Sequence, residues 1–297
     1  MHGFLNINKP AGMTSFDVIR KLKPRLPKRT RIGHLGTLDP MATGVLPIAI
    51  GQATRIIPYV EGGDKEYIAS MTLGGVSDTQ DAWGEITYNQ PVNISREQLE
   101  AVIPSFQGKI WQEPPMYSAV HHQGVRLYEL ARQGQTVERK KRCIEIKTLE
   151  LLQFDDRVSQ PTADLKVICS PGTYIRTLCH DIGQQLGTGA FLSALTRTRS
   201  GNFLLSQAVD LEIIIENWSD SLLLPMDYPL QDWPYLILRT AEQIKALQNG
   251  QTIHVSGKIP AGLLRVYQPN EKLLAITKVY YDGNRCSLKP ERVFHNQ

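Results

Sequence analysis

The most informative stretch of the sequence is Gly33-His-Leu-Gly-Thr-Leu-Asp-Pro-Met-Ala-Thr-Gly-Val-Leu-Pro-Ile-Ala-Ile-Gly51, which has one carboxylate, Asp39, at its centre. Glycines before and after Asp39 let the backbone fold tightly there, and Pro40 restricts the chain directly after it. The apolar residues 45–50 predict a short buried strand, although Pro47 indicates an edge or irregular one. The stretch therefore predicts a tight loop that holds a carboxylate still.

The residues around Asp39 indicate what this carboxylate does. Asp-Pro is a common turn starter, so Asp39 taken alone is also consistent with turn chemistry. Directly upstream lies Lys28-Arg-Thr-Arg31, and cations next to a presented anion suit a polyanionic substrate. The combination favours nucleophilic or acid–base chemistry on nucleic acid.

The same stretch resembles the catalytic motif of the tRNA pseudouridine synthase B family, whose members isomerise uridine 55 in the T-loop of tRNA. Further segments resemble the family's motifs in the family's order: Gly3–Ser15, Lys65–Tyr67, Glu113–Ala119, Tyr128–Gly134, Gly172–Arg176 and Ala194–Arg197. Only residues 235–297 match weakly, by layout more than by residues. A long motif and a fixed order are far more specific than a lone Asp-Pro.

The pattern of elements predicts an α+β fold, because helices and strands are mixed without regular alternation. Helix caps, apolar periodicity and glycine stops predict helices that start at Thr14, Ser95, Thr173 and Thr240. Alternating or apolar runs predict strands over 65–73, 143–152, 163–169, 262–267, 272–278 and 285–288, with a hairpin turn at 281–284.

The resemblance adds an expected domain organisation. It implies a pseudouridine synthase catalytic domain over 1–230, with a mixed, largely antiparallel sheet flanked by helices and loops and an RNA-gripping insertion at about 108–142. Three prolines between 224 and 234 indicate a boundary. Beyond it, 235–297 is expected to form a small β-rich, PUA-like RNA-binding domain.

The resemblance also implies the residues of the reaction. Asp39 is the catalytic carboxylate, and Arg176 in Gly-Thr-Tyr-Ile-Arg is its partner, which should lower the Asp39 pKa by about one to three units. Tyr67 is expected to stack on uracil and to take part in proton handling. Without the resemblance, Arg176 would be read as a surface arginine and Tyr67 as half-buried core.

Five further residues are expected to contact the substrate. Tyr174 and Leu195 resemble the family's remaining pocket positions, and His34 resembles the histidine that fills the space vacated by a flipped base. Lys9 and Arg31 complete the predicted substrate-binding set. A lone histidine is more often structural, so the role of His34 rests on the resemblance alone.

One departure from the family pattern lies in the predicted insertion. Members usually carry Lys after Tyr-Ser-Ala-Val, whereas this chain has His121-His122. Histidine is largely neutral at pH 7, so the phosphate contact is expected to be weaker or pH-sensitive here.

The composition, with 41% hydrophobic and 21% charged residues, is ordinary for a globular protein. The net charge of +4 is only mildly basic, but basic residues gather in runs at 21–31, 139–142 and 197–199. The four cysteines show no Cys-x-x-Cys spacing, which predicts no zinc site. No apolar run is long enough for a membrane helix, which predicts a cytoplasmic protein.

Three functions are compatible with these motifs. The leading one is a cofactor-free and metal-free tRNA pseudouridine(55) synthase, a monomer that grips the T-arm and reaches the acceptor stem through its C-terminal domain. The second is a tRNA-folding chaperone with little or no catalysis. The third is the guide-RNA-dependent relative found in ribonucleoprotein particles, which the retained insertion and the lack of long charged tails disfavour.

Overall fold

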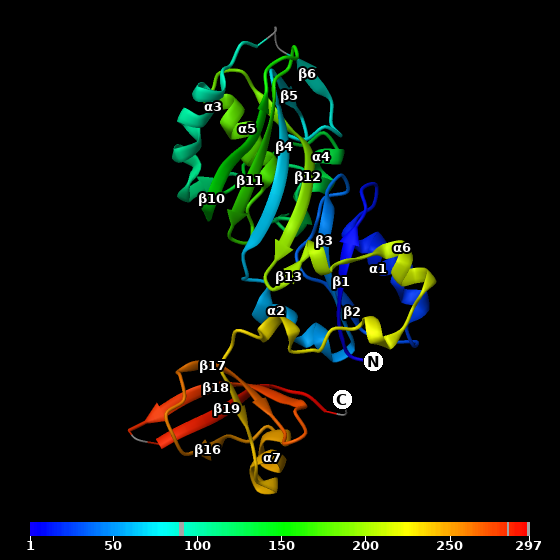
Figure 1. Cartoon of the computed structure of the whole chain (residues 1–297), viewed down its shortest axis with the longest axis vertical. Coiled ribbons are helices and arrows are strands. Elements are labelled where there is room, and N and C mark those ends of the chain that lie inside the picture. The colour runs from blue at the N-terminus through cyan, green and yellow to red at the C-terminus, as the bar shows by residue number, and fades with distance from the viewer. Residues whose placement is uncertain (89–91, 284, 296–297) are drawn as a thin grey trace.

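The computed structural model describes residues 1–88, 92–283 and 285–295, which form two successive sheets (Figure 1). The larger sheet has the strand order β14-β1-β3-β12-β4-β11-β10-β7, with β2 on β3 and β13 on β12. Its strands are β1 (Gly3–Lys9), β2 (Ile32–His34), β3 (Thr43–Ile50), β4 (Lys65–Leu73), β7 (Gly108–Gln112), β10 (Arg142–Asp155), β11 (Thr162–Cys169), β12 (Ala190–Ser200), β13 (Phe203–Leu204) and β14 (Val209–Asp210).

The larger sheet is mixed and mostly antiparallel, because only the β1–β14 and β3–β12 pairs run parallel. Along β4 every second side chain is buried, so one face of the strand packs against the core. The helices of this part are α1 (Ser15–Leu22), α2 (Ile57–Val60), α3 (Arg96–Val102), α4 (Leu127–Arg132), α5 (Ile175–Gln185) and α6 (Leu211–Glu216). The predicted α+β class is confirmed.

One continuous core lies between this sheet and its helices. Apolar residues of α3 and α5, such as Leu99 and Leu178, share it with the sheet residues Met71 and Val167. Apolar residues of α1 and α6 join the same cluster over β1 and β3. Both predicted capping boxes are present, at Thr14 and at Ser95, and each begins its helix one residue later.

The prediction that Pro47 marks an edge strand is wrong, because β3 lies inside the sheet between β1 and β12. The carbonyl of Pro47 accepts a hydrogen bond from the Leu35 N–H (2.9 Å), so its missing N–H points away from β1. On that side, β3 pairs with β12 at Thr43 and Gly44, and its pairing with β2 starts at Ile48. The proline therefore falls where β3 changes partners, and no ladder bond is lost.

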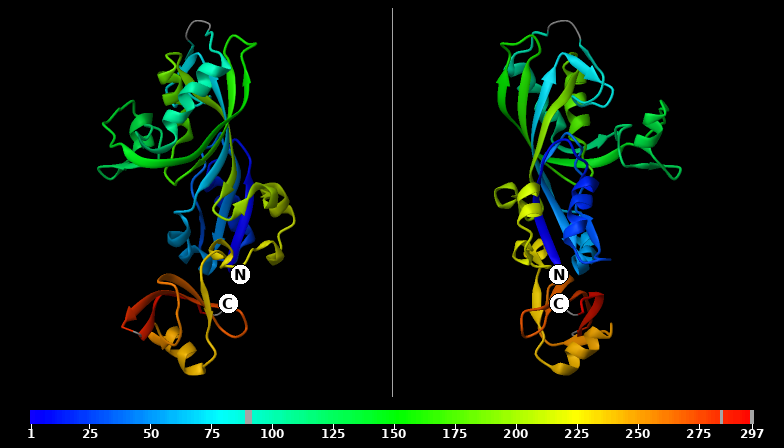
Figure 2. Two further views of the ribbon diagram at one scale, coloured as in Figure 1. Left: turned by 60° about the vertical axis from the view of Figure 1, so that its left-hand side comes forward. Right: turned by 90° about the vertical axis from the view of Figure 1, so that its right-hand side faces the viewer.

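Two small hairpins extend from this body. The first joins β5 (Gly75–Ser77) to β6 (Ile86–Tyr88), and the second joins β8 (His121–His122) to β9 (Val125–Arg126). The second belongs, with α4, to the chain between β7 and β10, which projects sideways from the sheet (Figure 2). The arm therefore consists of residues 113–141, whereas residues 108–112 of the predicted insertion form β7 of the larger sheet.

The second sheet has the order β15-β17-β18-β19-β16 and packs against α7 (Ala241–Gln248). Its strands are β15 (Tyr235–Ile237), β16 (Ile253–Val255), β17 (Gly262–Tyr267), β18 (Leu273–Asp282) and β19 (Arg285–Val293). The last two are longer than predicted, and they pair as far as Asp282 and Arg285. Two residues of the predicted turn, Tyr281 and Asp282, therefore belong to β18, and its last residue, Asn284, lies outside the described residues.

The two parts share an apolar contact. Tyr267 of β17 and Phe294, which directly follows β19, belong to one buried cluster with Phe4 and Ile56 of the first part. Arg55 adds to it by donating a hydrogen bond to the Val293 carbonyl (2.7 Å). In the described ranges, no helix is long and apolar enough to cross a membrane.

Candidate active site

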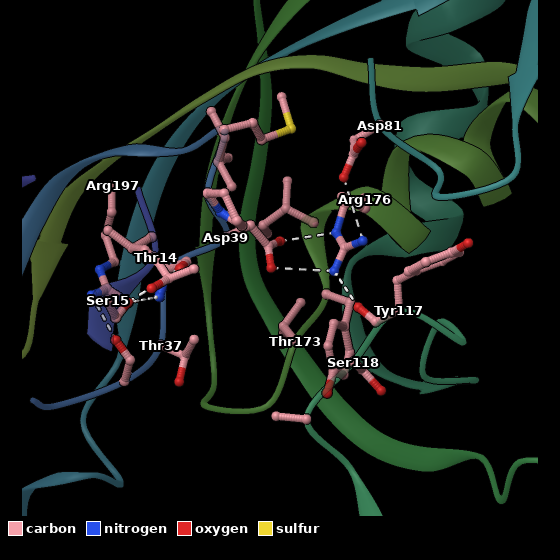
Figure 3. A pocket seen from close by; sticks show the side chains of 18 of the residues that line it. Thr14, Ser15, Thr37, Asp39, Asp81, Tyr117, Ser118, Thr173, Arg176 and Arg197 are labelled. Atoms are coloured by element: carbon pink, nitrogen blue, oxygen red, sulfur yellow. Dashed lines mark hydrogen bonds and ion pairs between the residues drawn. The ribbon is translucent and has the colours of Figure 1, made fainter. Parts of the chain in front are cut away.

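A cavity of about 1210 Å³ opens where the loop between β2 and β3 faces β4, the β5–β6 hairpin, the projecting arm and the start of α5. Its lining includes Asp39, Tyr67, Arg176, His34, Tyr174 and Leu195. These predicted site residues come from four separate segments of the chain, and the fold brings all of them to one cavity. Figure 3 shows Asp39 and Arg176 facing each other near its centre.

Two glycines are required by the loop that carries Asp39. Gly36 and Gly44 have φ of +71° and +100°, in the region that favours glycine. A Cβ on Gly44 would lie 2.2 Å from the Arg197 carbonyl oxygen, so the loop packs directly on β12. Glycine is therefore fixed here both by conformation and by close approach.

The same loop is tied to helix α1. The Ser15 hydroxyl accepts a hydrogen bond from the Leu38 N–H (2.9 Å) and donates one to the Leu38 carbonyl (3.2 Å). One turn is closed by the Ala42 N–H, which donates to the Asp39 carbonyl (3.1 Å). These bonds hold the backbone on both sides of the carboxylate, as the sequence predicted.

Lys9 lies beneath this loop and does not line the cavity. Its side chain is fully buried, and Nζ donates hydrogen bonds to the carbonyls of Pro10 (2.9 Å), Met13 (2.8 Å) and Pro40 (3.4 Å). Burial lowers the pKa of Lys9 to about 8, with Asp39 opposing this shift. The structure therefore gives Lys9 a supporting role under the loop in place of the predicted substrate contact.

Arg176 is the centre of the polar network. Its side chain is 5% exposed, with Nε 2.9 Å from Asp39 Oδ2, and Nη2 donates to Asp39 Oδ1 (3.3 Å). Nη1 lies 3.4 Å from Asp81 Oδ2 and donates to the Thr79 carbonyl, while Nη2 donates to the Tyr117 carbonyl (3.0 and 2.9 Å). The guanidinium therefore joins the Asp39 loop, the β5–β6 hairpin and the arm (Figure 3).

The pKa of Asp39 is raised above its ordinary value of 3.8, with burial as the main cause. Arg176 lowers it and the nearby Asp81 carboxylate raises it further, so the pairing does not outweigh burial. The predicted lowering of this pKa is therefore wrong. The carboxylate is still 34% exposed, and that exposed part faces the cavity.

Tyr67 and Arg197 form the floor of the cavity from neighbouring strands, where they are paired in register. Arg197 is 1% exposed, and its guanidinium donates to the carbonyls of Val45 (2.7 Å) and Gly36 (2.9 Å). Burial raises the pKa of the Tyr67 hydroxyl, and Arg197 opposes that shift. Arg197, which the sequence placed in a basic run suited to RNA contact, is instead a buried residue that holds the Asp39 loop on β3.

His34 and Tyr174 also line the cavity. The pKa of His34 is lowered by burial and by Arg197, so the imidazole is neutral at pH 7, and its buried Nδ1 has no hydrogen-bond partner among the described residues. The backbone of Tyr174 is fixed by Gln112, whose side chain accepts from the Tyr174 N–H (2.7 Å) and donates to its carbonyl (3.0 Å). Leu195 adds an apolar surface that is 6% exposed.

Two of the predicted contact residues lie at the outer surface. Arg31 is exposed and does not line the cavity, and His121 is exposed on the hairpin of the arm. The arm lines the cavity with residues 117–119 and with Arg126, Tyr128 and Arg132. It therefore supplies cations and aromatic rings to the cavity wall.

Reasoning from the sequence missed Asp81 and Lys65. Both are buried, at 6% and 7% exposure, and both line the cavity. Lys65 Nζ donates to the carbonyls of Glu61 (2.8 Å) and Gly63 (2.5 Å), and burial lowers its pKa to about 8. Lys65 lies in the segment Lys65–Tyr67, which resembles a family motif, so its position could have been noticed. No residue near Asp81 in the sequence indicated a role for it, because its charge partner, Arg176, comes from the distant helix α5.

The arrangement suits one kind of chemistry. A carboxylate is presented to a cavity with a fixed guanidinium beside it and a tyrosine hydroxyl on the floor. Such a group can attack an electrophilic carbon or remove a proton from a bound substrate. The described residues contain no group of three or more His, Cys, Asp or Glu side chains placed to hold a metal ion.

Comparison with known proteins gives consistent results along the chain. Residues 23–175 match the model of the TruB family pseudouridylate synthase N-terminal domain. Residues 176–231 match the tRNA pseudouridylate synthase B C-terminal domain, and 239–294 match the model described as pseudouridine synthase II TruB, C-terminal.

Curated relatives match over almost the whole chain. The tRNA pseudouridine synthase B of Syntrophomonas wolfei is 57% identical over 99% of this chain and 99% of its own, and that of Pseudomonas fluorescens is 41% identical over 99% and 96%. Among solved structures, an H/ACA RNP bound to a substrate RNA containing 2′-deoxyuridine has a TM-score of 0.73 at 24% identity, covering 99% of this chain and 85% of that one. At that identity the likeness supports the fold only.

Proposed function

This chain belongs to the TruB family of pseudouridylate synthases, and we propose that it converts uridine 55 in the T-loop of tRNA to pseudouridine. The observation that carries the proposal is the pairing of Asp39 with Arg176 inside the cavity. The matched relatives are tRNA pseudouridine synthases, and the site has the carboxylate that this reaction needs.

The proposed reaction is an isomerisation in which atoms balance without a co-reactant. The bond from ribose C1′ to uracil N1 breaks, the base turns, and a bond from C1′ to C5 forms. The proton on C5 then leaves, and N1 gains a proton. A cofactor is therefore not needed, and the protein has to supply a carboxylate, a shielded pocket and a route for the C5 proton.

We assign Asp39 to the reacting end of the nucleoside. Ionised Asp39 can attack C1′, add to C6 of the base, or assist loss of the base to a glycal, and its position is compatible with all three. Arg176 holds the carboxylate in place and favours its ionised form against burial. The Asp81 carboxylate forms an ion pair with Nη1 of the same guanidinium, so Arg176 is a positioning residue that two carboxylates share.

Tyr67, Tyr174 and Leu195 are proposed to hold the base. The ring of Tyr67 offers a stacking surface on the cavity floor, and its raised pKa keeps the hydroxyl protonated at neutral pH. The hydroxyl can then donate a hydrogen bond and relay a proton. Leu195 and Tyr174 close the pocket around the base.

The target uridine lies in a folded loop of the tRNA, so its base has to be flipped out of that loop to reach Asp39 in the cavity. Turning a base out of a folded loop costs a few kcal/mol, which the protein offsets with replacement contacts. His34 suits this role, because it lines the cavity and its imidazole is neutral at pH 7. We propose that His34 occupies the space that the uracil leaves.

We further propose how the whole tRNA is bound. Residues 1–230 form the catalytic domain, whose arm grips the T-arm, with Arg31 on the same RNA-binding surface. Residues 235–297 form an RNA-binding domain that reaches the acceptor stem. The enzyme is proposed to work as a cytoplasmic monomer that needs neither a guide RNA nor a protein partner. The relatives matched over 99% of this chain are named tRNA pseudouridine synthase B, which supports tRNA as the substrate.

The proposal is tested by release of tritium from tRNA labelled at C5 of uridine. A synthase must release the label from position 55, because the C5 proton is lost in every turnover. A tRNA-folding chaperone would bind the same tRNA without releasing the label. Loss of label from a tRNA in which uridine 55 is replaced by cytidine would contradict the assigned position.

A further inference from the structure

Two exposed aromatic rings lie at the cavity that holds Asp39, and the roles assigned above use neither. Phe16 and Trp83 are 55% and 59% exposed. Among the exposed large apolar side chains of residues 1–88, 92–283 and 285–295, only these two line the cavity. Exposed aromatic surface is costly in water, so its concentration at one cleft points to a ligand.

The cavity is larger than one nucleoside requires. Pockets for drug-sized ligands have volumes of about 300–1,000 Å³, whereas this one has about 1210 Å³. Arg126 and Arg132 add cationic side chains to the wall. The space therefore suits a short run of nucleotides with their phosphates, with the target base as one member.

Phe16 is held close to the Asp39 loop. It follows Ser15, whose hydroxyl makes both hydrogen bonds to the Leu38 backbone, and it lies in the first turn of a helix with a capping box. The Arg20 guanidinium lies 5.6 Å from the centre of its ring. One face of the Phe16 ring is thereby supported, and the ring remains more than half exposed.

Trp83 is fixed from the other side of the cleft. Its backbone N–H donates to Asp81 Oδ1 (3.0 Å), and the other oxygen of that carboxylate pairs with Arg176. The turn is tight, because a Cβ on Gly84 would lie 2.1 Å from Asp78 Oδ1. The backbone that carries the ring is therefore ordered before a base stacks on it, which lowers the entropy cost of binding.

The segments that carry the two rings lie on either side of the reacting carboxylate (Figure 3). Figure 3 shows Ser15, which precedes Phe16, on one side of Asp39 and Asp81, two residues before Trp83, on the other. We propose that Phe16 and Trp83 are stacking sites for the unpaired nucleotides that flank the target uridine, one ring for each neighbour. This inference rests on the proposed function, because it places the target base at Asp39.

The test measures the binding of a T-arm stem-loop to Phe16→Ala and Trp83→Ala. Stacking of one base on an aromatic side chain is worth about 1–3 kcal/mol, so each variant should bind at least about fivefold more weakly. Tyr88→Ala is the matched control. Tyr88 is 54% exposed on the same hairpin as Trp83 but does not line the cavity.

Abasic nucleotides identify the partner of each ring. Each unpaired neighbour of the target is replaced in turn by an abasic nucleotide. If Trp83 stacks on that neighbour, the wild type loses affinity for the abasic RNA, and Trp83→Ala then loses no more. Phe16→Tyr and Trp83→Phe, which keep a ring, should restore most of the affinity.

Two results would overturn the stacking sites. One is an affinity for both alanine variants equal to that of Tyr88→Ala, and the other is losses from variant and abasic RNA that simply add. Turnover by the wild-type protein is measured on the same stem-loop. Normal turnover with unaffected variants refutes only the stacking sites, whereas tight wild-type binding without turnover refutes the proposed function.

Discussion

Replacing Arg176 tests the polar network on which the site depends. Arg176→Met keeps the length of the side chain but removes its charge and every donor. Two charge-assisted hydrogen bonds, to the carbonyls of Thr79 and Tyr117, would be lost, each worth about 1.5–3 kcal/mol. The Asp81 carboxylate, 9% exposed, would be left without its cation.

The expected cost is about 3–5 kcal/mol in the free energy of unfolding, the range for breaking a buried ion pair by removing one partner. Asp39 contributes less to this cost, because its side chain is 34% exposed. Arg176→Lys is the comparison variant. A lysine keeps the charge but lacks the planar fork, so it should recover part of the stability and little of the geometry.

The assay is equilibrium unfolding in urea, followed by circular dichroism for the wild type and both variants. The expected order of midpoints is wild type, then Arg176→Lys, then Arg176→Met, with equal slopes. An Arg176→Met protein within about 0.5 kcal/mol of the wild type, the usual range for surface substitutions, would refute the reasoning. It would mean that the carboxylates and carbonyls around Arg176 do not need their donor.

Three further predictions concern other parts of the chain. Because the pKa of Asp39 is raised, the folded protein binds a proton at this carboxylate more tightly than the unfolded chain does, and the contribution of Asp39 to stability falls as pH rises from about 3.8 through the higher folded-state pKa. Asp39→Asn should therefore gain stability relative to the wild type over that pH range. Urea unfolding curves that show a constant difference between the two proteins across that range would contradict this prediction. His121→Lys adds a cation to the exposed hairpin of the arm and should raise the salt slope of tRNA binding by about one, so an unchanged slope would exclude a phosphate contact there. Arg265 is 7% exposed and donates hydrogen bonds to the carbonyls of Gln231 (2.9 Å) and Trp233 (2.7 Å) in the linker. Arg265→Met should therefore loosen the C-terminal sheet and raise KM for full-length tRNA but not for a T-arm stem-loop. An equal change in KM for both substrates would contradict the proposed role of the C-terminal domain.

Features set by local interactions were predictable from the sequence. Capping boxes at Thr14 and Ser95 begin helices because their partners lie three residues away. The loop around Asp39 was predictable because Gly36 and Gly44 act on their own backbone. The meeting of Asp39 with Arg176 was implied only by the family resemblance, since the two segments lie far apart in the chain.

Features set by distant contacts could not be predicted. Pro47 is tolerated inside the sheet because it lies between the part of β3 that pairs with β12 and the part that pairs with β2. Lys9 and Arg197 look like surface cations in the sequence, yet carbonyl groups from neighbouring loops satisfy both in the interior. The direction of the Asp39 pKa shift also depends on burial and on Asp81, which local sequence does not report.

The most direct test of the central claim is turnover by Asp39→Asn on a T-arm stem-loop labelled with tritium at C5 of the target uridine. Asparagine keeps the size of the side chain and its contact with Arg176 but cannot supply a negatively charged oxygen. We predict stem-loop binding close to that of the wild type and no release of tritium above background. Tritium release by Asp39→Asn at the wild-type rate would contradict the assignment of Asp39 as the reacting carboxylate.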